Sequence, residues 1–278
     1  MSGLPRLAAL RVALPAGRER ERHPFDVPAV RAVAARPAGL RFDHPVTCFV
    51  GENGTGKSTL LEALAVAAGL PAVGSADAAR DPTLGPARAL ARRLTLEWAR
   101  KADRGFFLRA EDFFGFARRL ARERGELEAR LAELAEEYAA RDRSAHALTL
   151  AQGPMRSSLA DMTRRYGVDL DARSHGESFL TLFHARLVPD GLFLLDEPEA
   201  ALSPQRQLGL LAMIGDSVRQ GAQFVVATHA PVLLAYPGAR LYTFDGDGAP
   251  RPAEFGELEH VRLTREFLAA PERFLRYL

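Results

Sequence analysis

The sequence predicts an α/β fold built around a largely parallel β-sheet, and three segments carry this prediction. The first is the phosphate-loop pattern G-x-x-x-x-G-K-[ST], which lies at residues 51–58. The second is an apolar run that ends in the acidic pair Asp196 and Glu197. The third is the apolar segment 223–228, which is followed by His229. Continuous apolar runs of this kind are typical of strands that are buried on both faces of a parallel sheet.

The phosphate-loop pattern has the local context that it requires. Residues 46–50 before it read as a buried strand, and residues 59–65 after it read as a helix. Glycines let the backbone turn so that N–H groups point at phosphates, and the helix N-terminus adds partial positive charge. Lys57 would reach the β- and γ-phosphates, and the Ser58 hydroxyl would ligate Mg²⁺. The expected nucleotide-binding residues are Gly51, Glu52, Asn53, Gly54, Thr55, Gly56, Lys57, Ser58 and Thr59.

Lysine is rare in this chain, and this sharpens the prediction at Lys57. Among 37 basic residues, lysine occurs only at positions 57 and 101, and arginine fills all the others. A compact point charge therefore stands where phosphates need it. The net charge of +2 is too small to indicate nucleic-acid binding, and the one cysteine, Cys48, reads as a packed core thiol. No apolar run approaches the length of a membrane span, so the protein is expected in the cytoplasm.

The first third of the chain supplies a strand, a loop and the helix of the phosphate loop. Residues 4–14 read as a strand, and the polar residues 15–30 as a loop in which Phe25 or an arginine could stack on a base. The helix after the phosphate loop ends near residues 69–71. A connection rich in Pro and Gly follows over residues 71–88.

Two strand candidates and a helix come next. Residues 94–98 alternate like a strand, although a helix over 87–101 is an alternative, and residues 105–110 are a better strand candidate. The hydrophobic period then changes to that of a helix, with an apolar stripe that Gly125 could split into two helices. This stripe indicates either a helix packed on its own domain or a surface for a partner helix. It contains Phe113, Leu120, Leu127, Leu131, Leu134 and Tyr138.

The acidic pair ends a strand that should lie beside the phosphate loop. Asp196 is placed to hold Mg²⁺, and Glu197, which points the other way, can orient and deprotonate water. A helix that begins with proline follows over residues 204–220. The final segments, 239–245 and 256–278, read as an edge strand and a helix.

These motifs, in this order, resemble those of the ABC-type ATPases. Residues 51–58 are similar to the Walker A motif, and residues 192–197 to Walker B with its catalytic glutamate. Residues 174–177 resemble the signature motif, and residues 199–203 occupy the D-loop position. His229 matches the switch histidine of the family.

The resemblance implies the architecture of a P-loop NTPase, an ABC-type head with a mixed or parallel sheet and a helical lobe. Residues 1–278 would form a single unit. Within it, residues 1–110 and 186–278 would build the nucleotide-binding lobe. Residues 111–185 would build the helical lobe that carries the signature motif.

The resemblance also implies ATP and Mg²⁺ as ligands, and a head-to-head homodimer that encloses ATP between protomers. Ser174 and the backbone of Gly176, with Glu177 beside them, would meet the γ-phosphate of the nucleotide on the other protomer. The catalytic residues would be Glu197, His229 and Lys57, and the metal ligands would be Ser58 and Asp196.

The chain departs from the ABC pattern at several positions. Glu177 stands where the signature has Gln, Ser203 stands at the D-loop aspartate, and either Glu111 or the distant Gln152 would replace the Q-loop glutamine. These changes argue against membrane-transporter subunits. The runs 196–204 and 227–231 more closely resemble stand-alone ATPases related to the recombination-repair, chromosome-maintenance and overcoming-lysogenization groups. The alternatives are the nucleotide-binding subunit of a membrane transporter and a slow ATP-switch regulatory protein. DNA enters as a candidate partner by analogy with the family alone.

Overall fold

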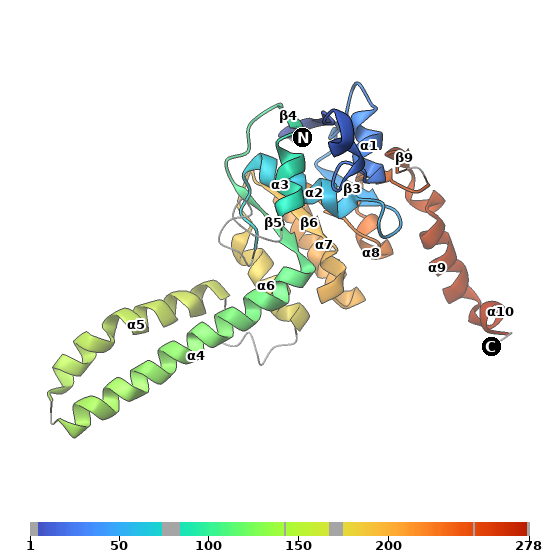
Figure 1. Ribbon diagram of the computed structural model, residues 1–278. Coiled ribbons are helices and arrows are strands. Elements are labelled where there is room, and N and C mark those ends of the chain that lie inside the picture. Colours follow the sequence, from blue (N-terminus) through green and yellow to red (C-terminus); the bar gives the residue numbers. More distant parts are fainter. Residues whose placement is uncertain (1–4, 74–83, 142, 167–174, 247, 277–278) are drawn as a thin grey trace.

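The fold is organised around one large sheet, seen in a computed structural model that describes residues 5–73, 84–141, 143–166, 175–246 and 248–276 (Figure 1). The strands of the described residues are β1 (Leu7–Val12), β2 (Leu40–Arg41), β3 (Val46–Val50), β4 (Leu94–Trp98), β5 (Gly105–Arg109), β6 (Leu192–Asp196), β7 (Gln223–Ala227), β8 (Arg240–Thr243) and β9 (Arg251–Ala253). Six of them form a sheet in the order β5-β6-β7-β3-β8-β9, in which all neighbours are parallel except β8 and β9. The other three form an antiparallel sheet in the order β2-β1-β4. The predicted α/β fold with a mixed, largely parallel sheet is confirmed.

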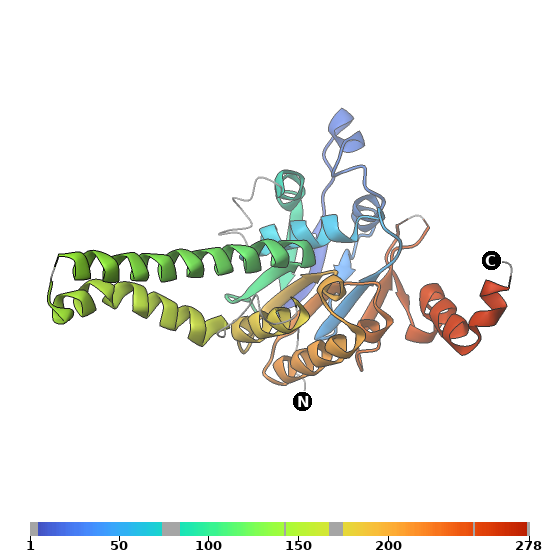
Figure 2. The same cartoon turned by 90° about the horizontal axis from the view of Figure 1, so that it is seen from below.

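Helices cover the large sheet and also extend beyond it (Figures 1 and 2). The α-helices of the described residues are α1 (Pro28–Ala34), α2 (Lys57–Ala68), α3 (Gly85–Ala91), α4 (Ala110–Ala140), α5 (Ala145–Tyr166), α6 (His175–Arg186), α7 (Pro204–Arg219), α8 (Pro231–Leu234), α9 (Glu259–Ala269) and α10 (Pro271–Leu275). Short 3₁₀ turns lie at Gly17–Glu21, Pro198–Ala201 and Phe255–Glu257. The helix predicted over 204–220 corresponds to α7 and begins with its proline, as expected.

The apolar runs of the sequence become the central strands of the large sheet. Every residue of β3, β6 and β7 is buried, as a strand with helices on both faces requires. Because these strands are parallel, their carboxyl ends meet at one edge of the sheet. The phosphate loop, the acidic pair and His229 therefore emerge side by side.

The two faces of the sheet are packed by different helices. On one face, Leu60, Leu61 and Leu64 of α2 join the core cluster that contains Phe49. On the other face, α6 and α7 pack on a cluster rich in phenylalanine, in which the rings of Phe106 and Phe183 meet edge to face at 5.8 Å. Such burial and ring packing stabilise the strand order that brings the motifs together.

A side chain joins the two sheets. The side-chain amide of Gln223, at the start of β7, accepts a hydrogen bond from the Leu7 N–H at 2.8 Å and donates one to the Leu7 carbonyl at 3.0 Å. Gln223 is buried and thus pairs with β1 in the way that another strand would. The small antiparallel sheet is held to the base of the large one by this contact.

The helices α4 and α5 form an antiparallel hairpin that projects from the body of the molecule (Figures 1 and 2). The expectation that Gly125 splits α4 is wrong, since α4 runs without a break from Ala110 to Ala140. One glycine weakens a helix by only about 1 kcal/mol. Here the i,i+4 ion pairs Arg122–Glu126 and Arg124–Glu128 span it.

Three further expectations are corrected by the strand and helix bounds. A helix over 87–101 is wrong, because α3 ends at Ala91 and β4 follows it. The strand predicted over 239–245 is not an edge strand, because β8 pairs with both β3 and β9. The C-terminal helix is two helices, since Pro271 has no N–H with which to continue α9.

Candidate functional site

The phosphate loop joins β3 to α2 and uses glycine at its sharpest turns. Gly51, Gly54 and Gly56 all have positive φ angles, of 141°, 84° and 100°. A Cβ on Gly56 would fall 2.0 Å from Cγ1 of Val27, so only glycine fits there. The loop is further held by the Ala29 N–H, which donates to the Thr55 carbonyl at 3.0 Å.

The side chain of Lys57 is folded back onto this loop. Its Nζ donates to the carbonyls of Gly51 at 2.6 Å and Glu52 at 2.8 Å, and the residue is only 4% exposed. Burial lowers the pKa of Lys57, while the carboxylates of Glu197 and Asp196 oppose that shift. An ammonium group is thus held at the start of α2, where anions bind.

Ser58 and Asp196 form the link between the phosphate loop and the acidic strand end. The Ser58 hydroxyl donates to Oδ1 of Asp196 at 3.0 Å. Burial raises the pKa of Asp196 to about 7, with the nearby carboxylates of Glu62 and Glu197 adding to the shift. A hydroxyl and a carboxylate are the hard oxygen donors that Mg²⁺ takes in proteins, in company with substrate phosphates. The residues present therefore fit this ion, and its positive charge would lower the raised pKa of Asp196.

The remaining predicted catalytic residues lie on the neighbouring strand ends. Glu197 has a left-handed backbone with φ of 47°, which turns the chain directly after β6. Its Oε1 lies 3.9 Å from Nε2 of His229, and the two side chains are 46% and 36% exposed. Glu197 and His229 are therefore both accessible at the carboxyl edge of the sheet.

Two further acidic residues hold the site together: Glu199, which opens the segment at the D-loop position, and Asp245, which no sequence pattern indicated. Oε1 of Glu199 accepts a hydrogen bond from the His229 N–H at 2.7 Å. Oδ1 of Asp245, two residues beyond β8, accepts one from the Glu52 N–H at 3.2 Å. Position at the end of a parallel strand is the signal that could have found Asp245, because β8 lies beside β3.

An ion pair supports the site from the β5 side. Arg109 ends β5 opposite Asp196 in the strand register, and its Nη1 lies 3.2 Å from Oε1 of Glu62 on α2. Both side chains are largely buried. The sequence patterns did not indicate this pair, because its partners are 47 residues apart.

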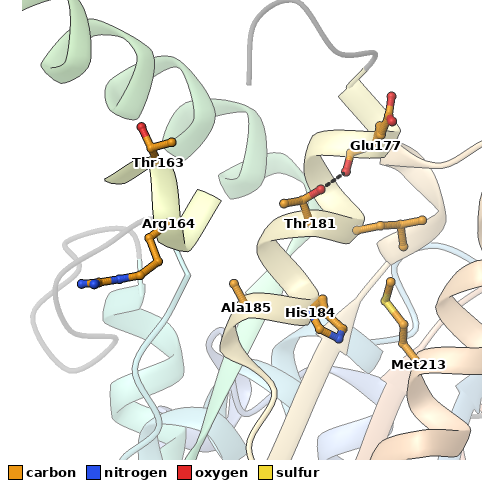
Figure 3. Close-up of a pocket in the computed structure, with 8 residues that line it drawn as sticks. Thr163, Arg164, Glu177, Thr181, His184, Ala185 and Met213 are labelled. Carbon is orange, nitrogen blue, oxygen red and sulfur yellow. Dashed lines mark hydrogen bonds between the residues drawn. The ribbon is translucent and has the colours of Figure 1, made fainter. Parts of the chain in front are cut away.

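The predicted signature residues are only partly described. Ser174 lies outside the described residues, and Gly176 is in the first turn of α6. Glu177 is exposed, and its Oε2 lies 4.0 Å from Nη2 of Arg206 on α7. It lines an open pocket of about 660 Å³ between α5, α6 and α7, together with Thr181 and other residues (Figure 3). No residue of the phosphate loop lines this pocket. In this pocket, Glu177 therefore does not face the phosphate loop of its own chain.

Two other expectations are wrong. Gln152 cannot replace the Q-loop glutamine, because it is buried in the α4–α5 hairpin, where its Nε2 donates to the Leu131 carbonyl at 3.1 Å. Phe25 cannot stack on a base, because it is buried in the core cluster of α2. Glu111, the other Q-loop candidate, lies in the first turn of α4, and its side chain is outside the described set.

Comparisons with known families match the two halves of the site. An AAA domain model matches residues 31–80, which contain the phosphate loop. A second AAA domain model, whose description also names an AbiEii toxin of a Type IV TA system, matches residues 178–235. That segment contains the acidic pair and His229. No curated protein matches the chain.

Solved structures with a similar course of the chain include ABC and SMC proteins. The chain is 15% identical to CbiO1 from Clostridium perfringens, part of the ABC transporter complex CbiONQ. The match covers 98% of this chain and 100% of CbiO1, with a TM-score of 0.48. It is 16% identical to the SMC head domain from Thermotoga maritima, with 79% and 94% covered and a TM-score of 0.41. It is 13% identical to the Smc head domain from Pyrococcus furiosus with an extended coiled coil bound to the C-terminal domain of ScpA, with 84% and 94% covered and a TM-score of 0.38.

The fold and the family matches lead to one conclusion about the class of protein. The phosphate loop has its strand and helix, its lysine and its serine, and the acidic strand end lies against it. Both halves of this site lie in segments that match AAA domain models, in the same order along the chain. The chain therefore has the α/β fold and the phosphate loop of a P-loop domain, and the two segments that build its site are similar to AAA domains.

Proposed function

We propose that the chain binds Mg-ATP at residues 51–59 and hydrolyses it to ADP and phosphate. The observation that carries this proposal is the hydrogen bond between Ser58 and Asp196, next to the buried ammonium of Lys57. A hydroxyl, a carboxylate and a cation are thereby gathered at the N-terminus of α2, where a polyphosphate and its metal ion would both find ligands.

In this proposal, binding begins with the phosphate loop. The N–H groups of the loop and the first turn of α2 would surround the phosphates. Lys57 would leave the carbonyls of Gly51 and Glu52 and reach the β- and γ-phosphates. Burial disfavours the charged form of Lys57. A phosphate within reach would favour that charged form again, because the two groups have opposite charges.

Ser58 and Asp196 would hold Mg²⁺. The ion would supply positive charge that stabilises the negative charge developing on the phosphate during hydrolysis. With a pKa of about 7, Asp196 is partly protonated at neutral pH before the ligand arrives. Binding of the cation would therefore release this proton.

Glu197 and His229 would act at the terminal phosphate. Glu197 would orient the attacking water and take its proton, which its exposed position after β6 allows. His229 would donate a hydrogen bond to the γ-phosphate through Nε2, which has no hydrogen-bond partner among the described residues. Glu199 holds the His229 backbone in place for this role.

The signature segment would complete the site of a second protomer. We propose that ATP brings two chains together head to head, so that Ser174, Gly176 and Glu177 meet the nucleotide bound by the other. The exposed position of Glu177 supports this part of the proposal. The helical lobe would then comprise residues 111–185, and the nucleotide-binding lobe the segments 1–110 and 186–278.

The oligomeric state of Glu197→Gln tests the dimer. This change removes the base but keeps the shape of the side chain, so a monomer should double in mass with Mg-ATP in light scattering and stay single with Mg-ADP. A mass that does not respond to ATP contradicts the head-to-head dimer. A further increase with duplex DNA would show a nucleic-acid partner.

Among the described residues, no helix has the length and the apolar character that a membrane span needs.

A pair of lysine variants tests nucleotide binding itself. Lys57→Ala should abolish phosphate release from Mg-ATP and weaken ATP binding by at least about tenfold, since a buried charge contact is lost. Lys101→Ala is the matched control, because Lys101 is the other lysine of the chain and is exposed. Equal activity of the two variants would remove Lys57 from the mechanism, and no activity in the wild type would refute the proposal.

A further inference from the structure

Four polar side chains form a closed ring between α2 and the ends of β5 and β6. Ser58 and Glu62 lie four residues apart on α2 and therefore on one face of that helix. The hydroxyl of Ser58 donates to Oδ1 of Asp196 at 3.0 Å. Nη1 of Arg109 donates to Oε1 of Glu62 at 3.2 Å. Because Arg109 and Asp196 are partners in the register of β5 and β6, the ring closes through the sheet.

The side chains of Arg109 and Asp196 point to the same face of the sheet. Side chains alternate along a strand, so Arg109 shares the face of Phe107, two residues before it. By the same rule, Asp196 shares the face of Leu194. Phe107 and Leu194 both belong to the core cluster that contains the leucines of α2. Neighbouring strands are about 4.8 Å apart, which is less than the length of an arginine side chain, so the Asp196 carboxylate is within reach of the Arg109 guanidinium.

Neither charged group has water as an easy alternative to a partner. Arg109 and Asp196 are each 8% exposed. A buried charge is costly unless an opposite charge or hydrogen bonds accompany it, and a guanidinium fits a carboxylate especially well. Without Glu62, the register would offer Asp196 to Arg109 as a partner. Such a pair would occupy the oxygens of the proposed metal ligand and place a positive charge where the cation binds.

We propose that Glu62 is a positioning residue of the magnesium site, because it holds the guanidinium of Arg109 and so leaves the carboxylate of Asp196 to the metal ion. The inference rests on the proposed binding of Mg-ATP. The guanidinium and the metal ion are both positive and would otherwise compete for one carboxylate. The ion pair between α2 and β5 thereby gains a role in metal binding, beyond the packing of the helix on the sheet.

Affinities for AMP-PNP, a hydrolysis-resistant analogue of ATP, test the inference with and without Mg²⁺. Glu62→Gln should weaken binding of Mg-AMP-PNP about tenfold and change binding of AMP-PNP in EDTA by less than about twofold, because the loss concerns the metal ligand. The double variant Glu62→Gln/Arg109→Gln should recover to within about threefold of the wild type, since the competing charge is gone. Glu126→Gln is the matched control, because it breaks an ion pair with Arg122 on the exposed hairpin.

Recovery in the double variant is the result that a purely structural ion pair would not give. If the pair did no more than brace α2, removal of its second partner would leave the loss unchanged or enlarge it, and this outcome overturns the inference. An equal loss with Mg²⁺ and in EDTA overturns it as well. Wild-type protein that binds no nucleotide refutes the proposed function instead.

Thermal unfolding in EDTA at pH 8 gives a second reading that needs neither nucleotide nor metal. In Glu62→Gln, Arg109 should pair with Asp196, so the further change Asp196→Asn should lower the midpoint of unfolding by about 2 °C or more. In the wild-type background the same change should not lower the midpoint, because there Glu62 holds Arg109. Equal effects of Asp196→Asn in the two backgrounds would show that Glu62 does not keep Arg109 from Asp196.

Discussion

The hydroxyl of Ser58 donates a hydrogen bond of 3.0 Å to the carboxylate of Asp196, although the two residues are 138 positions apart. Ser58 lies in the first turn of α2 and Asp196 is the last residue of β6, so the contact joins the phosphate loop to the acidic strand end. Parallel pairing of β6 with β7, and of β7 with β3, brings the two residues together. The predictions that follow begin with this pair.

Ser58→Ala should lower the rate of Mg-ATP hydrolysis about tenfold or more, because it removes an oxygen ligand of the metal ion. Ser58→Thr keeps a hydroxyl and should keep most of the activity, as the phosphate-loop pattern allows either residue. Ser158→Ala, on the exposed hairpin, is the control. If Ser58→Ala turns over ATP at the wild-type rate, Ser58 is not a metal ligand.

Asp196→Asn should stabilise the nucleotide-free protein at alkaline pH. Because the pKa of Asp196 is raised from 3.8 to about 7 in the folded state, the folded protein holds this proton more tightly than the unfolded chain. The stability that the protonated group contributes is fully present below about pH 4 and is lost as the pH rises to about 7. Asn cannot ionise and escapes that loss.

Thermal unfolding of both proteins at pH 5 and pH 8 measures this effect. The advantage of Asp196→Asn over the wild type should be larger at pH 8 by at most about 3 kcal/mol, which follows from about two units of pH. For Asp161→Asn on the hairpin, the difference in stability from the wild type should be the same at pH 5 and pH 8. An advantage that is the same at both pH values contradicts the buried, raised carboxyl.

Gly56→Ala should destabilise the protein more than Gly54→Ala. Both glycines have positive φ, which costs about 1–2 kcal/mol for alanine. A Cβ on Gly56 would also meet Val27, whereas a Cβ on Gly54 has no heavy atom within 4 Å. The midpoint of thermal unfolding should therefore be lower for Gly56→Ala by about 2 °C or more. Val27→Ala should recover part of the difference, and equal midpoints would exclude the clash.

Gln223→Leu should lower the free energy of unfolding by about 2–4 kcal/mol. The change removes two buried hydrogen bonds and leaves the N–H and the carbonyl of Leu7 without them. Gln220→Leu, at the exposed end of α7, should change stability by less than about 0.5 kcal/mol. Urea denaturation monitors both, and a loss below about 1 kcal/mol would mean that Gln223 does not join the sheets.

Local patterns predicted the parts of this fold that depend on near neighbours in sequence. The apolar runs before the phosphate loop and before the acidic pair became β3 and β6, because buried parallel strands carry few polar residues. The phosphate loop followed from glycine spacing and a rare lysine. These signals are contained within ten residues or so of chain.

The errors arose where tertiary packing decided. Phe25 lies in a polar segment but is buried, and nothing in its neighbours along the chain indicates that burial. Gln152 satisfies the Leu131 carbonyl across the hairpin, a contact that sequence cannot show. Asp245 holds a backbone N–H group of the site and belongs to no sequence pattern with fixed spacing. Hydrogen bonds between distant positions became visible only in the fold.

The hairpin has a mechanical consequence. α4 contains 31 residues, which at 1.5 Å per residue gives a rigid rod of about 45 Å. Its first residue, Ala110, directly follows Arg109, the residue opposite Asp196 in the sheet. A rotation of about 10° at this base would move the far end by about 8 Å, nearly the width of a helix. A small rotation at the end of β5 would thus produce a displacement of several ångströms at the far end of the α4–α5 hairpin.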